Sequence, residues 1–80
     1  MRARVFVTLK AGVLDPVGKA VEKSLHTLGF PEASQVRLGK YIELEVEAKD
    51  SAAAKSRVEH MCQKLLANTV VENFKVEILP

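Results

Sequence analysis

The stretch VRLGKYIELEV, residues 36–46, decides the fold of this chain, because it can form either a hairpin or one continuous strand. Gly39 and Lys40 stand between two runs of alternating apolar and polar residues, which is typical of a tight turn between strands. A two-residue turn, however, would put Leu38 on the same face as Glu43 and would divide the apolar residues between both faces. The two-residue hairpin is therefore disfavoured.

Two arrangements keep the apolar residues of this stretch on one face. In the first, the extended region 34–49 contains one long strand that is kinked at Gly39. In the second, residues 39–41 form a three-residue loop with a bulge, so that Leu38 pairs with Ile42. We favour the long strand. Thirteen extended residues would span about 43 Å, whereas a fourteen-residue helix covers about 21 Å, so one end of the strand would overhang and need another chain.

The rest of the chain alternates between strands and helices. Residues 2–10 and 71–79 alternate in polarity, as half-buried strands do. Residues 15–30 and 50–69 are predicted to form helices, each capped by an aspartate. The first helix also has Pro at its first position and Gly29 at its end. The apolar stripe of each helix follows helical spacing: Val17, Val21, Leu25 and Leu28 in the first, and Ala54, Val58, Met61, Cys62 and Leu65 in the second.

The order strand, helix, strand, helix, strand predicts an α+β fold in the form of a two-layer α/β sandwich. Because each helix has one apolar stripe and each strand one apolar face, we expect both helices on one side of the sheet. The bulged hairpin would add a strand and give a ferredoxin-like βαββαβ order instead. Eighty residues predict a single domain, residues 1–80.

Composition excludes several classes of protein. The net charge of +2 comes from 12 basic and 10 acidic residues that are interspersed, which is not the pattern of a nucleic-acid-binding protein. Cys62 is the single cysteine, so an intrachain disulfide and a cysteine-based zinc site are both impossible. No apolar run approaches the ~20 residues of a membrane span, and the N-terminus does not resemble a signal peptide. We expect a cytoplasmic protein without a membrane or nucleic-acid partner.

No group of residues predicts catalysis. His26 and His60 are isolated and are expected on solvated helix faces, while Cys62 is expected to pack in the core. The alternating glutamates of residues 43–47 are expected to be solvated or to pair with basic residues of the first strand, rather than to hold a metal ion. The Gly-Lys pairs lack the spacing of a phosphate-binding loop. We therefore expect no catalytic, cofactor-binding or metal-ligating residue in this chain.

Two short segments are candidates for contact with another chain. The first surrounds the kink at Gly39 and contains Arg and Tyr, which are favoured residue types at interfaces. The second follows the second helix, where Asn68 and Thr69 could hydrogen-bond to a partner. The structural alternatives are an ordinary exposed turn and a helix stop in which Asn68 takes a left-handed backbone. The predicted interface residues are Arg37, Gly39, Lys40, Tyr41, Asn68 and Thr69.

Three stretches resemble the small PurS subunit of phosphoribosylformylglycinamidine (FGAM) synthase. VLDPVGKAV (13–21) matches the family pattern V-L-D-P-x-G, and RLGKY with Glu43 (37–43) matches R-x-G-K-Y. MCQKLLANTVVEN (61–73) matches M-C-x-K-L-L-A-N-T-V, and the resemblance covers essentially the whole chain. Asn73, where an acidic residue is common, and the mixed charge balance depart from the family pattern.

The resemblance implies a PurS-like fold and a non-catalytic role in a ligase. The complex of that family converts formylglycinamide ribonucleotide (FGAR), glutamine and ATP into FGAM in de novo purine biosynthesis. The large subunit uses the ATP and magnesium, and a glutaminase subunit releases ammonia. The PurS-type subunit works as a homodimer or a tetramer, bridges the other two and supports ammonia transfer. The alternatives are a stand-alone RNA-binding domain, which would display two or three aromatic residues on an open sheet face, and a small-molecule regulatory module.

Overall fold

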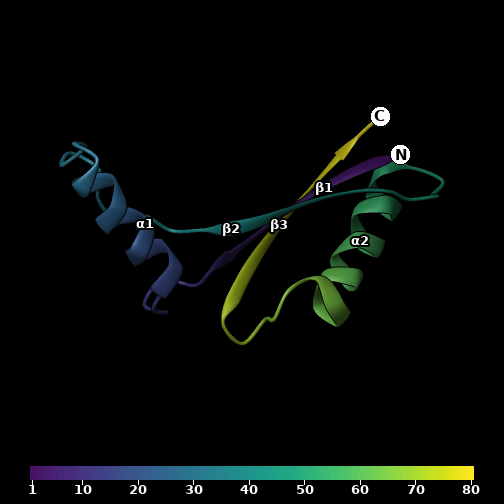
Figure 1. Cartoon of the computed structure of the whole chain (residues 1–80). Helices are drawn as coiled ribbons and strands as arrows, with labels where there is room; N and C mark the ends of the chain where they lie inside the picture. Colours follow the sequence, from purple (N-terminus) through teal and green to yellow (C-terminus); the bar gives the residue numbers. More distant parts are fainter.

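The computed structural model describes all 80 residues as a three-stranded sheet with two helices (Figure 1). The strands are β1 (Arg2–Leu9), β2 (Gly39–Glu45) and β3 (Glu72–Leu79), all antiparallel in the order β2-β1-β3. The helices are α1 (Pro16–Thr27) and α2 (Ser51–Met61), and α2 continues into one π-helical turn, η1 (Cys62–Leu66). The predicted α+β fold and the predicted order of strands and helices are confirmed.

The stretch at residues 36–46 does not form a hairpin. β2 is an edge strand paired with β1, from Gly39 opposite Thr8 to Glu45 opposite Arg2, which excludes the ferredoxin-like alternative. The prediction of a long strand is wrong in its extent, because β2 has seven residues and begins at Gly39. The backbone N–H of Leu38 donates to a side chain at the start of α1 instead of joining the sheet.

Gly39 allows the backbone of β2 to lie close to that of β1, and it is not a kink with unusual backbone angles. Its φ is not in the left-handed region, where the structure has only Gly12, Gly29 and Gln35. A Cβ on Gly39 would lie 2.5 Å from the carbonyl oxygen of Val7 in β1. Any side chain there would therefore push β2 away from β1 at the first residue of the pair.

The core lies between one face of the sheet and α2. Alternation in β1 buries Ala3, Val5 and Val7, and Val76 of β3 joins them, as the sequence predicts. Asp50 caps α2 by accepting a hydrogen bond from the N–H of Ala53 at 2.8 Å. The residues that α2 and η1 contribute to this core are Ala54, Val58 and Cys62, all fully buried.

The predicted apolar stripe of the second helix is wrong at Leu65, whose exposed fraction is 83%. In η1 the N–H of Ala67 donates to the carbonyl of Cys62, five residues back, at 3.0 Å. A π turn widens the helix by one residue, and the side chains beyond it are rotated out of register with the α-helical stripe. Leu65 therefore points away from the face that holds Val58.

α1 begins and ends as predicted but does not join the core. Asp15 caps it, Pro16 occupies its first position, and Gly29 follows it with a φ of 101°. The helix has at most marginal contact with any strand or with α2, and it projects beyond one end of the sheet (Figure 1). The expectation that both helices cover one side of the sheet is therefore wrong within a single chain, where α2 alone does so.

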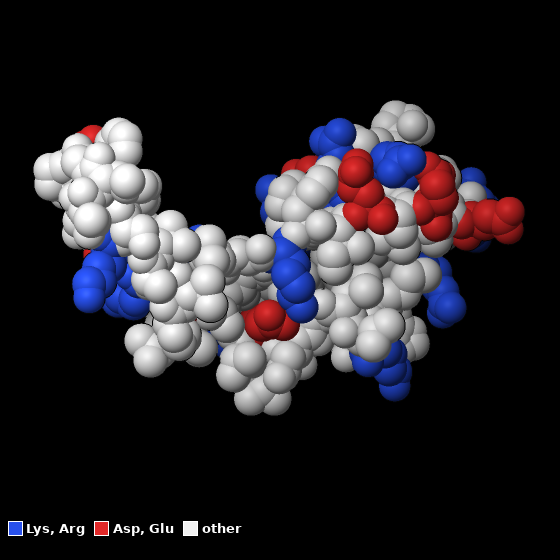
Figure 2. All heavy atoms as spheres, in the orientation of Figure 1, with Lys and Arg blue, Asp and Glu red and all other residues white.

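The projecting helix makes the molecule elongated, with extents of 50 × 26 × 14 Å. Its radius of gyration is 15.9 Å, whereas a compact chain of this length would have about 12 Å. Its accessible surface is 5774 Å², against about 4,800 Å² for an average monomer of this mass. Figure 2 shows a concave surface between the lobe formed by α1 and the body formed by the sheet and α2. The side of the α1 lobe that faces this concavity carries almost no charged side chains.

Candidate subunit interface

No strand or other helix of the chain packs on the apolar stripe of α1. We call Val17, Val21, Leu25 and Leu28 the arm surface. Val17 is 60% exposed and Leu28 is 72% exposed, while Val21 and Leu25 are only half-buried. Leu14 and Phe30 at the two ends of the helix are also exposed. An amphipathic helix normally buries such a stripe against another element, so the arm surface is the clearest uncovered apolar face of the molecule.

A second uncovered apolar area lies on the helix side of the sheet. α2 packs over β1 and β3 but has no more than marginal contact with β2. The gap leaves a hollow of about 300 Å³, which we call the β2 hollow. Its lining residues are Ile42, Leu44, Met61, Lys64, Leu65 and Leu66. The apolar face of β2 is therefore not covered by a helix of this chain, and no strand of this chain covers the apolar stripe of α1.

The predicted interface residues around Gly39 do not form one patch. The guanidinium of Arg37 donates to the carbonyl oxygen of Lys10 in its own chain at 3.1 Å. Lys40 lies opposite Val7 in the register and therefore points to the α2 side, where its Nζ is 3.9 Å from Glu72. Tyr41 points to the other side of the sheet because successive strand residues alternate. The role of these residues in contact with another chain stays a prediction.

The outer face of the sheet carries an aromatic pair and a charged ladder. The rings of Phe6 and Tyr41 lie 5.1 Å apart, and Tyr41 is 52% exposed. Arg2 pairs with Glu45 at 3.2 Å and with Glu43 at 3.8 Å. The prediction that the glutamates of β2 pair with basic residues of the first strand is thus confirmed at Arg2. This face has no covering layer in the chain.

The turn after η1 is closed by its own hydrogen bonds. Glu72 accepts from the N–H of Asn68 at 2.7 Å, and the side chain of Asn68 accepts from the N–H of Val70 at 3.2 Å. The helix does stop in this segment, which was one of the two alternatives, but it ends with extended Ala67, and Asn68 does not take the left-handed backbone. Asn68 and Thr69 are both exposed. Val70 in the same turn is 81% exposed and was not among the predicted interface residues.

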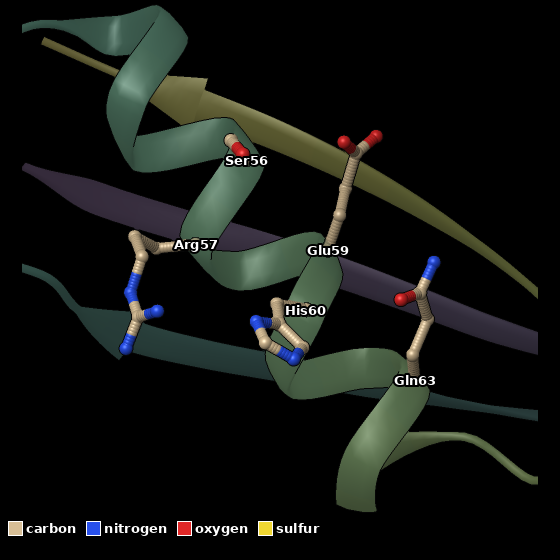
Figure 3. A pocket seen from close by; sticks show the side chains of 5 residues that line it. All are labelled: Ser56, Arg57, Glu59, His60 and Gln63. Atoms are coloured by element: carbon tan, nitrogen blue, oxygen red, sulfur yellow. The ribbon is translucent and has the colours of Figure 1, made fainter.

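A polar depression on the outer side of α2 offers no arrangement for catalysis. Its lining residues are Ser56, Arg57, Glu59, His60 and Gln63. Figure 3 shows their side chains projecting from successive turns of one helix without converging on a common point. The surface there is open and rests on a single element. The arrangement fits a solvated helix face better than a substrate site.

The remaining groups that could react are tied to structural roles. Cys62 is buried, and burial raises the pKa of its thiol, with a smaller contribution from the nearby Glu59 carboxylate. The prediction that Cys62 packs in the core is confirmed. His26 is exposed on α1, with Nε2 2.6 Å from the carbonyl oxygen of Ala33.

Neither helix is long and apolar enough to span a membrane.

The fold and its uncovered surfaces define a class: a small α+β protein whose helix layer is incomplete within one chain. Residues 2–80 match the PurS family, described as phosphoribosylformylglycinamidine (FGAM) synthase. The chain is 55% identical over 75 residues to the PurS subunit of FGAM synthase from Synechocystis sp., covering 94% of this chain and 75% of that protein. It therefore belongs to the PurS family, whose members are subunits of FGAM synthase in purine biosynthesis.

Solved structures agree with this assignment and confirm the PurS-like fold. The PurS structure from Bacillus subtilis has a TM-score of 0.88 and 44% sequence identity, covering 99% of this chain and 98% of that one. A chain in the structure of PurLQS from Thermotoga maritima has a TM-score of 0.89 and 36% identity, covering 98% of this chain and 95% of that one. Family membership thus displaces the alternatives of a stand-alone RNA-binding domain or a regulatory module.

Proposed function

We propose that this chain is the non-catalytic subunit that bridges the large synthetase subunit and the glutaminase subunit of FGAM synthase and supports the transfer of ammonia between them. The observation that carries the proposal is its similarity, over nearly its whole length, to a chain of the PurLQS assembly of Thermotoga maritima. Uncovered apolar surfaces on α1 and at β2 support a role in assembly. On this proposal, ATP and magnesium are used by the large subunit, and the complex works in the cytoplasm.

We further propose that the chain works as a homodimer in which each arm surface packs into the β2 hollow of the other chain. The arm surface is an apolar helix face without a sheet, and the β2 hollow is an apolar sheet face without a helix. Reciprocal packing of two chains about one two-fold axis would cover both the arm surface and the β2 hollow of each chain. It would also complete the predicted sandwich, with two helices over each sheet.

The area available is adequate for a stable dimer. The chain exposes on the order of 1,000 Å² more than an average monomer of its mass. A standard-size interface buries about 800 Å² on each partner. The excess surface of one chain is thus about what one partner contributes to such an interface. This comparison favours a second copy as the partner of the arm surface, and the larger subunits would then contact the outside of the dimer.

Reconstitution tests the bridging role. Purified large and glutaminase subunits from the same source are assayed for FGAM formation with glutamine, and separately with ammonium chloride, with and without this chain. We expect the chain to be required for glutamine-dependent synthesis, because ammonia must pass between two subunits that it joins, and to be far less important when ammonia is supplied. The chain by itself should form neither ADP nor FGAM. Full glutamine-dependent activity without the chain would refute the bridging role.

A further inference from the structure

Two of the stretches that carry the family resemblance, residues 13–21 and 37–43, meet at the base of α1. Asp15 is buried, with an exposed fraction of 5%. Its Oδ1 accepts from the N–H of Gly18 at 2.8 Å, and its Oδ2 accepts from the N–H of Leu38 at 2.8 Å. One carboxylate therefore joins the first turn of the helix to the residue that precedes β2. An ordinary helix cap needs only the first of these bonds.

Gly18 brings the same two segments into close contact. A Cβ on Gly18 would lie 2.5 Å from the carbonyl oxygen of Val36, so a side chain at this position would displace the backbone of residues 36–38. One helical turn further on, Glu22 accepts from the N–H of Val36 at 3.2 Å. The segment before β2 is thus held along the first two turns of α1 at two backbone N–H groups, those of residues 36 and 38.

These contacts replace the core packing that usually orients a helix. α1 has at most marginal contact with the strands and with α2, so packing of its apolar stripe on these elements cannot fix its direction. Gly18, which has no Cβ, lies where residues 36–38 cross α1. The Asp15 carboxylate bonds to both segments at this crossing. The guanidinium of Arg37, on the same segment, reaches back to the end of β1 at Lys10.

We propose that Asp15, Gly18 and Leu38 form a clamp that fixes the direction of α1 relative to the sheet and so presents the arm surface to a second chain. Asp15 is then a positioning residue for assembly, beyond its role as a helix cap. The role of the clamp in assembly rests on the proposed homodimer. The clamp itself does not, because all of its contacts lie within one chain.

Substitution by serine separates the two roles of Asp15. Serine is a good helix cap, so Asp15→Ser keeps the bond to the first turn of α1, but its shorter side chain cannot also reach the N–H of Leu38. Asp50→Ser in α2 is the matched control, because Asp50 caps its helix in the same way and the only side-chain bond it makes is to Ala53. Gly18→Ala is a second variant that displaces residue 36 while raising helix propensity.

Single-molecule energy transfer reports the direction of α1 in isolated chains. Dyes are attached after Lys23→Cys on α1 and Ser56→Cys on α2, both at exposed positions, while buried Cys62 is spared. We expect the chains to be monomeric at picomolar concentration, so the measurement needs neither the dimer nor the synthase. We expect one narrow efficiency distribution for the native chain and for Asp50→Ser. The distribution should be broad or displaced for Asp15→Ser and Gly18→Ala.

Assembly is measured in parallel by dilution of unlabelled chains. We expect Asp15→Ser to raise the dimer dissociation constant at least tenfold while circular dichroism shows unchanged helix content, and Asp50→Ser to leave that constant unchanged. A native-like narrow distribution for both clamp variants would overturn the proposal, even if their dimers were weaker. If the native chain does not dimerise at all, the proposed homodimer fails, whereas the energy-transfer result still decides the clamp.

Discussion

The most direct test of the arm surface is Leu28→Ser. Leu28 is 72% exposed in the single chain, so most of the free energy of burying its side chain is still to be gained on association. Full burial of a leucine is worth about 1.5–3 kcal/mol, and the exposed part corresponds to roughly 1–2 kcal/mol. Because a two-fold dimer contains the residue twice, the substitution should weaken dimerisation by roughly 2–4 kcal/mol, which is about 30-fold to 1,000-fold in the dissociation constant.

The assay is sedimentation or light scattering over a dilution series, with circular dichroism as a check of the fold. Val70→Ser is the matched control, because Val70 is 81% exposed but lies in the turn before β3, outside the arm surface. Neither substitution should change the stability of the sheet and α2 by more than about 0.5 kcal/mol, as is usual for exposed sites. The assignment of the arm surface is refuted if Leu28→Ser dimerises like the native chain, or if Val70→Ser weakens the dimer equally.

Three further predictions concern the sheet and the base of α1. Gly39→Val should destabilise the fold by about 1–3 kcal/mol in a denaturant melt, because its Cβ would meet the backbone of β1; a silent substitution would show that β2 can move. Tyr41→Ala should lower stability by about 0.5–1.5 kcal/mol through loss of its ring contact with Phe6, and should weaken capture of the two larger subunits in a pull-down; unchanged capture would remove Tyr41 from the interface. Hydrogen bonds from backbone N–H groups, that of Leu38 foremost, hold the pKa of Asp15 below its ordinary value of 3.8. The resulting stabilisation should be present above that value and lost as pH falls through the lowered folded-state pKa, so acid melts of native chain and Asp15→Ser should converge at low pH, and a constant difference would contradict the assignment.

Local chemistry was sufficient for much of the fold. Asp15 and Asp50 mark the beginnings of both helices, because their carboxylates can accept from the free N–H groups of a first turn. Strict alternation predicted the buried face of β1. The faces also decided against a two-residue hairpin at Gly39, since it would have divided the apolar residues between the core and the solvent. Each of these inferences depends on residues within a few positions of one another.

The candidate interface was predictable only in part. The sequence contained the arm surface as a regular apolar stripe, but the stripe was expected to pack on the sheet of its own chain. An amphipathic pattern states that a helix buries one face and does not state against which chain. Leu65 was assigned to the apolar stripe because the residue spacing does not predict the π turn, which rotates this side chain outward. The predicted segment around Gly39 proved to be divided between the two sides of the sheet, at Lys40 and Tyr41.

The sequence by itself determined the order of the strands and helices, where both helices begin, the buried face of β1, and, through three short stretches, the family to which the chain belongs. Tertiary structure alone decided where α1 points. That direction depends on hydrogen bonds and a close backbone approach between residues 15–22 and 36–38. The two segments are distant in sequence, and no residue spacing within either one predicts that they meet. Because those contacts hold the helix beyond the end of the sheet, the chain exposes both an apolar helix and the sheet face that lacks one.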